Sequence, residues 1–163
     1  MKKAFGCVCG LLLLLVGCNS VDCPMNNTVY TTYQLLRADG SVDTLRDSLT
    51  IITNQKVANQ DPVIVNRGIN LTELIVPISY EGDEDVFYYF FKDSTGYYAI
   101  DTVWVEKTNH PHFESVDCNP SYFHTLTGVH STHHMIDSLV INNPQVNYDA
   151  SKTHILLYLH SLD

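Results

Sequence analysis

The sequence predicts an all-β fold, a single antiparallel β-sandwich of about seven to nine short strands with an immunoglobulin-like or related topology. Three observations lead to this prediction. Short runs rich in β-branched and aromatic residues recur at a spacing of roughly 8–12 residues. Each run is bounded by Asn, Asp, Gly or Pro, the residues that favour turns. No segment shows the apolar periodicity of an amphipathic helix of three turns.

The expected strands lie at residues 28–37, 48–53, 62–66, 73–79, 86–92, 97–107, 122–129, 135–142 and 154–160. The first reads TVYTTYQLLR and ends at Asp39-Gly40, a pair typical of a hairpin turn. The charged turn EGDED at 81–85 precedes VFYYFFK, and STG at 94–96 leads into the next strand. There, with the period of two that a strand requires, Ile100, Thr102, Trp104 and Glu106 alternate with Asp101, Val103, Val105 and Lys107.

The aromatic run from Phe87 to Phe91 places rings on both faces of its strand. One face belongs to the core. For the other face, a second packed surface is favoured, and a flat platform for sugars or a protein partner is the alternative.

The N-terminus has the layout of a bacterial lipoprotein signal. Lys2 and Lys3 precede a short apolar stretch, and LVGC at 15–18 matches the lipobox in which Cys18 receives the lipid. The stretch is shorter than the roughly 20 apolar residues of a membrane-spanning helix. An ordinary signal peptide, with Cys18 unmodified, is the alternative. We therefore expect a signal peptide at 1–17, a lipid-anchored tether at 18–27 and the β-sandwich domain at 28–163.

Charge and the residues after Cys18 indicate compartment and partners. No aspartate follows Cys18 directly, which favours the outer membrane, and Asp22 alone is acidic in the next few positions, which favours the periplasmic side. Of 9 basic residues, Lys2 and Lys3 leave with the signal, so 7 basic and 18 acidic side chains remain, a net charge of −11. This charge disfavours nucleic acid as a partner. The expected partners are the membrane, through the anchor, and an envelope protein or glycan.

Cysteine use points to a disulfide. Cys7 and Cys9 leave with the signal and Cys18 is acylated, so Cys23 and Cys118 remain. In an oxidising envelope compartment these two are expected to pair. Two buried free thiols are the alternative, and a catalytic cysteine assisted by a nearby histidine is disfavoured, because spacing shows neither a placed base nor a thiolate-favouring setting.

Histidine is the one enriched residue type with potential chemistry. HSTHH at 130–134 brings His130, His133 and His134 together, and His110 and His112 flank Pro111, which predicts a loop or bend there. These five are the candidate ligands of a divalent metal, although neither spacing matches a specific metal motif. The acidic residues at 83–85 offer calcium ligands, but a solvated hairpin tip is favoured because the periodicity of an EF-hand is missing.

No catalytic signature is present. The mature chain has neither a GxSxG nucleophile elbow nor a phosphate-binding glycine loop, so no catalytic residue is assigned. The leading hypothesis is a non-enzymatic envelope module that binds a protein or glycan and needs no cofactor. The rivals are a metal-binding protein that uses the 130–134 region and a hydrolase with a carboxylate or histidine site of unrecognised type.

Several strings resemble a known family. They are CP at 23–24, NNTVY at 26–30, DTVWVEK at 101–107, HFESVDC at 112–118 and IDSLVIN at 136–142. Together they resemble a family of small lipoproteins of unknown function from Bacteroides-like gut and oral bacteria, over most of the mature chain. The resemblance implies a lipid-anchored β domain. It implies no activity, so no site residue follows from it.

Overall fold

The computed structural model describes Cys23 and residues 27–54 and 62–160, and all regular structure in these residues is β-strand. The strands are β1 (Tyr30–Leu36), β2 (Ser48–Thr53), β3 (Val63–Gly68), β4 (Glu73–Pro77), β5 (Glu84–Lys92), β6 (Tyr98–His112), β7 (Ser121–Ser131), β8 (Ile136–Ile141), β9 (Gln145–Val146) and β10 (Ile155–Leu159). Each expected strand overlaps an observed one, and the all-β prediction is confirmed. Among the described residues, no helix is long and apolar enough to span a membrane.

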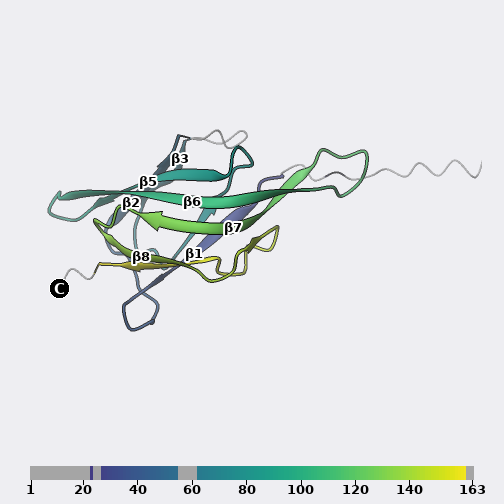
Figure 1. Cartoon of the computed structure of the whole chain (residues 1–163). Helices are drawn as coiled ribbons and strands as arrows, with labels where there is room; N and C mark the ends of the chain where they lie inside the picture. Colours follow the sequence, from purple (N-terminus) through teal and green to yellow (C-terminus); the bar gives the residue numbers. More distant parts are fainter. Residues whose placement is uncertain (1–22, 24–26, 55–61, 161–163) are drawn as a thin grey trace, which may run out of the picture.

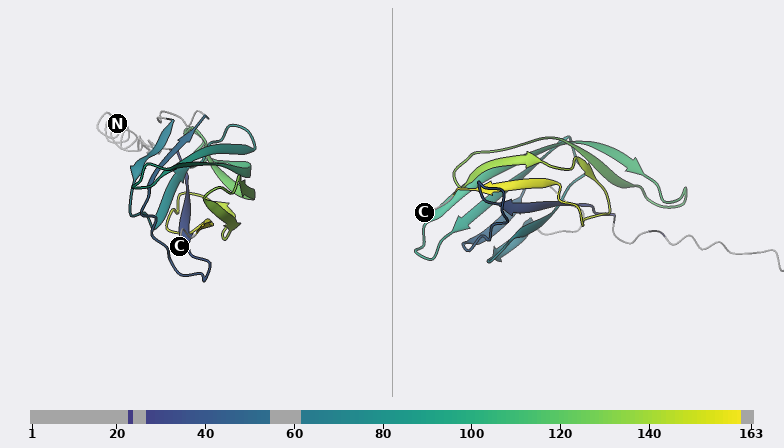
Figure 2. Two further views of the ribbon diagram at one scale, coloured as in Figure 1. Left: turned by 90° about the vertical axis from the view of Figure 1, so that its left-hand side faces the viewer. Right: turned by 90° about the horizontal axis from the view of Figure 1, so that it is seen from below.

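The strands form two layers (Figure 1). One sheet has four strands in the order β4-β1-β10-β8, and the other has six in the order β3-β2-β5-β6-β7-β9. Figure 2 shows β1 and β10 side by side in the smaller sheet. The two sheets pack as a β-sandwich, which confirms the predicted class.

Two details of the predicted sandwich are wrong. Strand β1 pairs with β10 in parallel, with Tyr33 opposite Ile155, so the sandwich is not purely antiparallel. A parallel pair needs a long connection, and here nearly the whole domain separates the two strands, so no local pattern reveals the pairing. The two-residue β9 raises the number of strands to ten, above the predicted range, and it is too short for a period of two to show.

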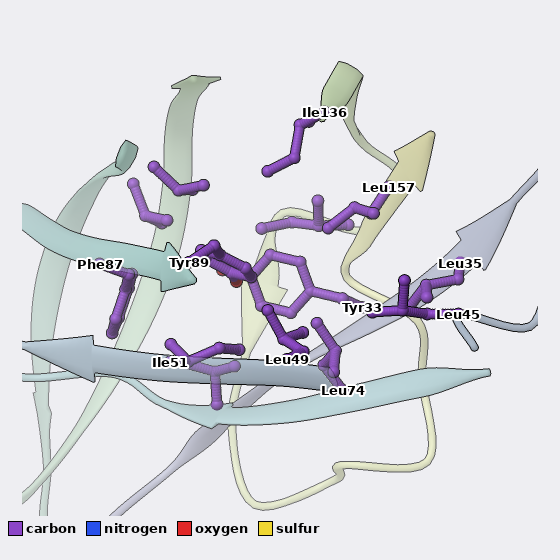
Figure 3. Packing of buried hydrophobic residues seen from close by; sticks show 14 of the residues in the cluster. Tyr33, Leu35, Leu45, Leu49, Ile51, Leu74, Phe87, Tyr89, Ile136 and Leu157 are labelled. Carbon is purple, nitrogen blue, oxygen red and sulfur yellow. The ribbon is translucent and has the colours of Figure 1, made fainter. Parts of the chain in front are cut away.

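The core lies between the sheets and follows the alternation of the strands. In β5, Phe87, Tyr89 and Phe91 point inward and are almost fully buried. Figure 3 shows Tyr89 facing Tyr33 of β1 across the interior, with aliphatic side chains of both sheets around them. Burying an aliphatic or aromatic side chain of this size stabilises a fold by about 1.5–3 kcal/mol, so this layer holds the sheets together.

The β6–β7 hairpin extends beyond the rest of the sheet (Figure 1). Strand β5 pairs with β6 only as far as Glu106, whereas β7 pairs with β6 as far as His112. The bend predicted at Pro111 is therefore wrong, because β6 runs through Pro111 opposite Tyr122. A proline is tolerated here because β7 is the only strand that pairs with β6 at this point. The missing N–H of Pro111 therefore leaves no carbonyl of a second neighbouring strand without a donor.

Candidate functional site

Rings and aliphatic side chains gather on the outer face of the six-stranded sheet. Burial alternates along β5 and β6, so every second side chain points away from the core. We call this surface the aromatic face; its residues are Val86, Tyr88, Phe90, Tyr98, Ile100 and Trp104. Register aligns them in rows, with Phe90 beside Ile100 and Val86 beside Trp104. Tyr98 and Ile100 are exposed and the other four are half-buried. An apolar patch that continues across strands on an outer face is typical of a binding surface.

Contacts at its two ends order the aromatic face. The Trp104 ring stacks on the ring of His130 in β7, with centroids 4.8 Å apart and planes 11° from parallel. At the other end, Lys92 Nζ lies 5.0 Å from the centroid of the Tyr98 ring, within cation–π range. Tyr98 is 60% exposed and Ile100 is 47% exposed, so these side chains are open to a partner.

A shallow depression of about 690 Å³ adjoins the aromatic face where β3, β2, β5 and β6 lie together. We call it the Arg67 groove; it is lined by Ser48, Thr50, Ile52, Arg67, Phe90, Lys92, Asp93 and Tyr98. The lining combines two rings with hydroxyl and charged groups. A ligand site in proteins has this composition, with apolar area for contact and a few polar groups for orientation.

The acidic turn contributes a second polar feature, buried in the core. Asp85 is 1% exposed and its Oδ1 lies 2.8 Å from Nζ of Lys107, which is also buried. Lys107 Nζ makes no hydrogen bond to the described residues, but attraction between charges depends on their distance, so the two groups form an ion pair. Ser79 donates from its hydroxyl to Oδ1 at 2.6 Å and from its backbone N–H to Oδ2 at 2.9 Å.

His124 lies next to this ion pair and is held neutral. Burial, and then the positive charge of Lys107, lower the pKa of His124 to about 4. Its Nδ1 lies 2.7 Å from Oδ1 of Asn109, and the Asn109 amide donates to the carbonyls of Tyr80 and Gly82. The loop before β5 is thereby held against β6. Asp85, Lys107 and His124 are thus enclosed in the core.

The HSTHH segment is organised around a buried carboxylate, Asp101. It accepts hydrogen bonds from the backbone N–H groups of His134 (2.7 Å), Met135 (2.7 Å) and Ile136 (3.0 Å) and from the Thr132 hydroxyl (2.7 Å). Burial raises the pKa of Asp101, but these donors outweigh burial and hold the pKa below its usual value. Asp101 therefore shapes the turn between β7 and β8.

The five histidines predicted as metal ligands lie in separate surroundings. His130 stacks on Trp104, His133 Nδ1 lies 3.1 Å from the Ile136 carbonyl oxygen, and His134 Nδ1 lies 3.2 Å from Asp101. At the far end of β6, His110 contacts the Thr125 hydroxyl, and His112 stacks on Phe123. Across the described ranges, no three His, Cys, Asp or Glu side chains are placed to share a metal ion.

The cysteines lie at the end of the projecting hairpin. Cys23 and Cys118 form a disulfide, with Cα atoms 5.4 Å apart, so the predicted pairing is confirmed. The cross-link ties the start of the described chain to the β6–β7 connection. Cys18, the predicted lipid attachment residue, lies outside the described residues, as do the signal at 1–17 and most of the tether.

The structure separates the members of the acidic turn. Asp83 is exposed, as expected of a hairpin tip, whereas Glu84 and Asp85 begin β5 and Asp85 enters the core. The prediction that Asp85 belongs to a solvated hairpin tip is therefore wrong. The alternation along β6 contained a signal for it: Lys107 shares the face of Val103 and Val105, and a cation on an apolar face needs a buried partner.

Sequence reasoning also missed the Arg67 groove. Arg67 follows a short apolar run, and nothing in that run predicts that it lines a depression together with Lys92 and Tyr98. The aromatic run did contain a signal for the neighbouring surface, because it predicted rings on both faces of the strand. Tyr88 and Phe90 lie on the outer face, where they are half-buried and not part of the second packed surface that was favoured.

Comparison with known proteins and protein families identifies the family of this chain. Neither the curated proteins nor the solved structures include a match to this chain. A family model described as a family of unknown function, DUF6452, matches residues 48–159, which include the aromatic face, the Arg67 groove and the buried ion pair. Because the match covers most of the chain, the chain belongs to the DUF6452 family of proteins of unknown function.

Proposed function

We propose that the chain is a lipid-anchored outer-membrane protein that faces the periplasm and binds a carbohydrate on its aromatic face without catalysing a reaction. The observation behind this proposal is the set of outward rings on β5 and β6, set among hydroxyl groups of neighbouring strands. Register places Thr50 beside Phe90, and Tyr88 beside Thr102. A sugar offers an apolar C–H face rimmed by hydroxyls, so a surface that alternates rings and hydroxyls complements it.

The position of the disulfide fits a membrane anchor. Cys23 follows Cys18 by five residues, a span of at most about 17 Å, so a lipid on Cys18 would hold the hairpin end close to the bilayer. Phe113 and Val116, near the tip of that hairpin, are 59% and 96% exposed. They would face the lipid surface.

The Arg67 groove lies at the other end of β6. Tyr98 begins this strand and His112 ends it, and 14 residue steps in a strand cover about 46 Å. Figure 1 shows the β5–β6 turn and the projecting hairpin at opposite ends of the domain. An anchor at the hairpin would therefore present the groove to the space away from the membrane, where a glycan can reach it.

Binding, rather than catalysis, fits the burial of Asp85, Lys107 and His124. Asp85, Lys107 and His124 are each no more than 2% exposed, so a substrate on the surface does not reach them. The side chains that a ligand does reach on the aromatic face are mainly rings and hydroxyls, which supply contact area and orientation.

The glycan proposal is tested with an array of neutral and acidic oligosaccharides and with ring variants of the purified protein. Tyr88→Ala and Trp104→Ala are each expected to weaken binding about tenfold, since a stacked ring contributes about 1.5 kcal/mol. The matched control is Tyr158→Ala, because Tyr158 is a half-buried outward ring on β10 of the other sheet. Absence of binding to every oligosaccharide would overturn the proposal.

The anchor is tested by replacing Cys18. In cells that process lipoproteins, the wild-type protein is expected in the membrane fraction and Cys18→Ser in the soluble fraction, because serine offers no thiol for the lipid. Ser20→Ala, close to the same cleavage site, is the control and should remain with the membrane. Retention of Cys18→Ser in the membrane fraction would contradict lipid anchoring.

A further inference from the structure

The Arg67 groove stands out by its charge in an acidic protein. The chain has a formal net charge of −9, yet two of its few cations, Arg67 and Lys92, line this one depression. Three of the other described cations are paired with carboxylates: Arg37 with Asp43, Lys107 with Asp85, and Lys152 with Asp149. Within the described residues, neither groove cation belongs to an ion pair of this kind.

The one carboxylate in the groove is engaged by its own turn. Asp93 Oδ1 accepts hydrogen bonds from the backbone N–H groups of Thr95 (2.8 Å) and Tyr97 (2.9 Å), and the Thr95 hydroxyl donates to both carboxylate oxygens. These donors order the β5–β6 turn and leave the two cations to face the depression. The groove therefore has a local excess of positive charge.

Arg67 is held in a conformation that an arginine adopts only at a cost. Its φ is +51°, in the left-handed region that favours glycine. The register between β2 and β3 jumps from Leu49 opposite Gly68 to Ile51 opposite Val65, so β3 carries one extra residue, as in a β-bulge. The backbone N–H of Arg67 donates to the Thr50 hydroxyl at 3.2 Å.

Bulges of this kind redirect a side chain, and a strained residue that is not glycine often marks a functional position. Glycine would fit the φ of residue 67 without strain but would remove the cation from the groove. The strain and the position of the charge are two independent observations, and both concern the same side chain.

We propose that the Arg67 groove binds a sugar that carries a carboxylate or a phosphate. The anion lies between Arg67 and Lys92, the apolar face of the sugar ring packs on Phe90, and the Thr50 hydroxyl bonds a ring substituent. Guanidinium groups recognise carboxylate and phosphate oxygens through paired N–H donors, which suits Arg67 to this role. The proposal deepens the proposed function and depends on it, because it names the ligand class.

The test measures binding of three probes to the purified protein by calorimetry: trigalacturonate, glucosamine 6-phosphate and neutral galactotriose. At least one acidic probe is expected to bind about tenfold more tightly than galactotriose, and added salt should reduce that preference because it screens charge. Binding of trigalacturonate alone identifies a uronic acid as the ligand, and binding of glucosamine 6-phosphate alone identifies a phosphosugar. Either result supports the proposal.

The decisive variants are Arg67→Gly and Arg67→Asn, since both residues tolerate a positive φ. Each should lose about tenfold in affinity for the acidic probe while its melting temperature is no lower than that of the wild type. Lys92→Gln should also weaken binding of the acidic probe. Arg37→Gln removes an exposed cation outside the groove and should leave this binding unchanged.

Two results would overturn the groove proposal and remain distinguishable. One result is that the wild-type protein binds galactotriose as tightly as the acidic probes, and that Arg67→Gly binds all three probes like the wild type. In that case the groove does not select an acidic sugar, although the protein still binds carbohydrate. If no probe and no oligosaccharide of the array binds, both the groove and the proposed function are wrong.

Discussion

Replacing Asp85 with asparagine is expected to lower the free energy of unfolding by about 3–5 kcal/mol, because the change leaves the Lys107 ammonium buried without a countercharge. Both side chains are almost inaccessible to water, and Nζ lies 2.8 Å from the carboxylate. Asparagine keeps the size of the side chain, so the loss reports charge rather than packing. Urea unfolding of the purified variant and the wild type measures it.

Two controls separate a buried ion pair from a surface one. The double variant Asp85→Asn with Lys107→Met removes both charges and keeps an acceptor for the Ser79 donors, so it should recover most of the stability lost in Asp85→Asn. Arg37→Gln breaks an exposed pair, in which Arg37 is 58% exposed, and should cost no more than about 1 kcal/mol. Equal losses for Asp85→Asn and Arg37→Gln would contradict the buried pair.

Alternation along the strands made much of this fold predictable. A period of two fixes which side chains share a face, so the rings of β5 divide between two faces as predicted, with Phe87, Tyr89 and Phe91 in the core. The other face was expected to be a second packed surface, whereas its rings Tyr88 and Phe90 are only half-buried. Turn residues placed the strand boundaries for the same local reason. Cys23 and Cys118 were predictable as a pair because counting the cysteines left no other partner.

Contacts between distant segments were not predictable. The parallel pairing of β1 with β10 depends on how the sheet closes, and the burial of Asp85 depends on Lys107 reaching it from β6. The conformation of Arg67 arises from the bulge between β2 and β3, which one sequence run cannot reveal. Only part of the candidate site was therefore predictable from the sequence. The rings of the aromatic face follow a local pattern, whereas the Arg67 groove depends on contacts between distant segments.

Removing the Cys23–Cys118 disulfide is expected to cost about 4–5 kcal/mol, because the bond closes a loop with a sequence separation of 95 and restricts the unfolded chain. In a domain of this size, that loss lowers the melting temperature by roughly 10–15 °C. Melting of Cys23→Ser with Cys118→Ser, compared with the wild type in the absence of reductant, measures the effect. Reductant should lower the wild-type midpoint and leave the double variant unchanged.

The loop that this disulfide closes contains strands of both sheets, from β1 to β6, so the loss should be global rather than confined to the hairpin. Hydrogen exchange distinguishes the two cases. A global loss increases exchange at Phe87 and Tyr89 in the core as much as at residues near the tip such as Phe123. If only amides of the projecting hairpin exchange faster, and the midpoint falls by less than about 3 °C, the bond merely fastens the hairpin locally. In that case closing the long loop does not stabilise the whole domain, and the disulfide only holds the hairpin beside Cys23.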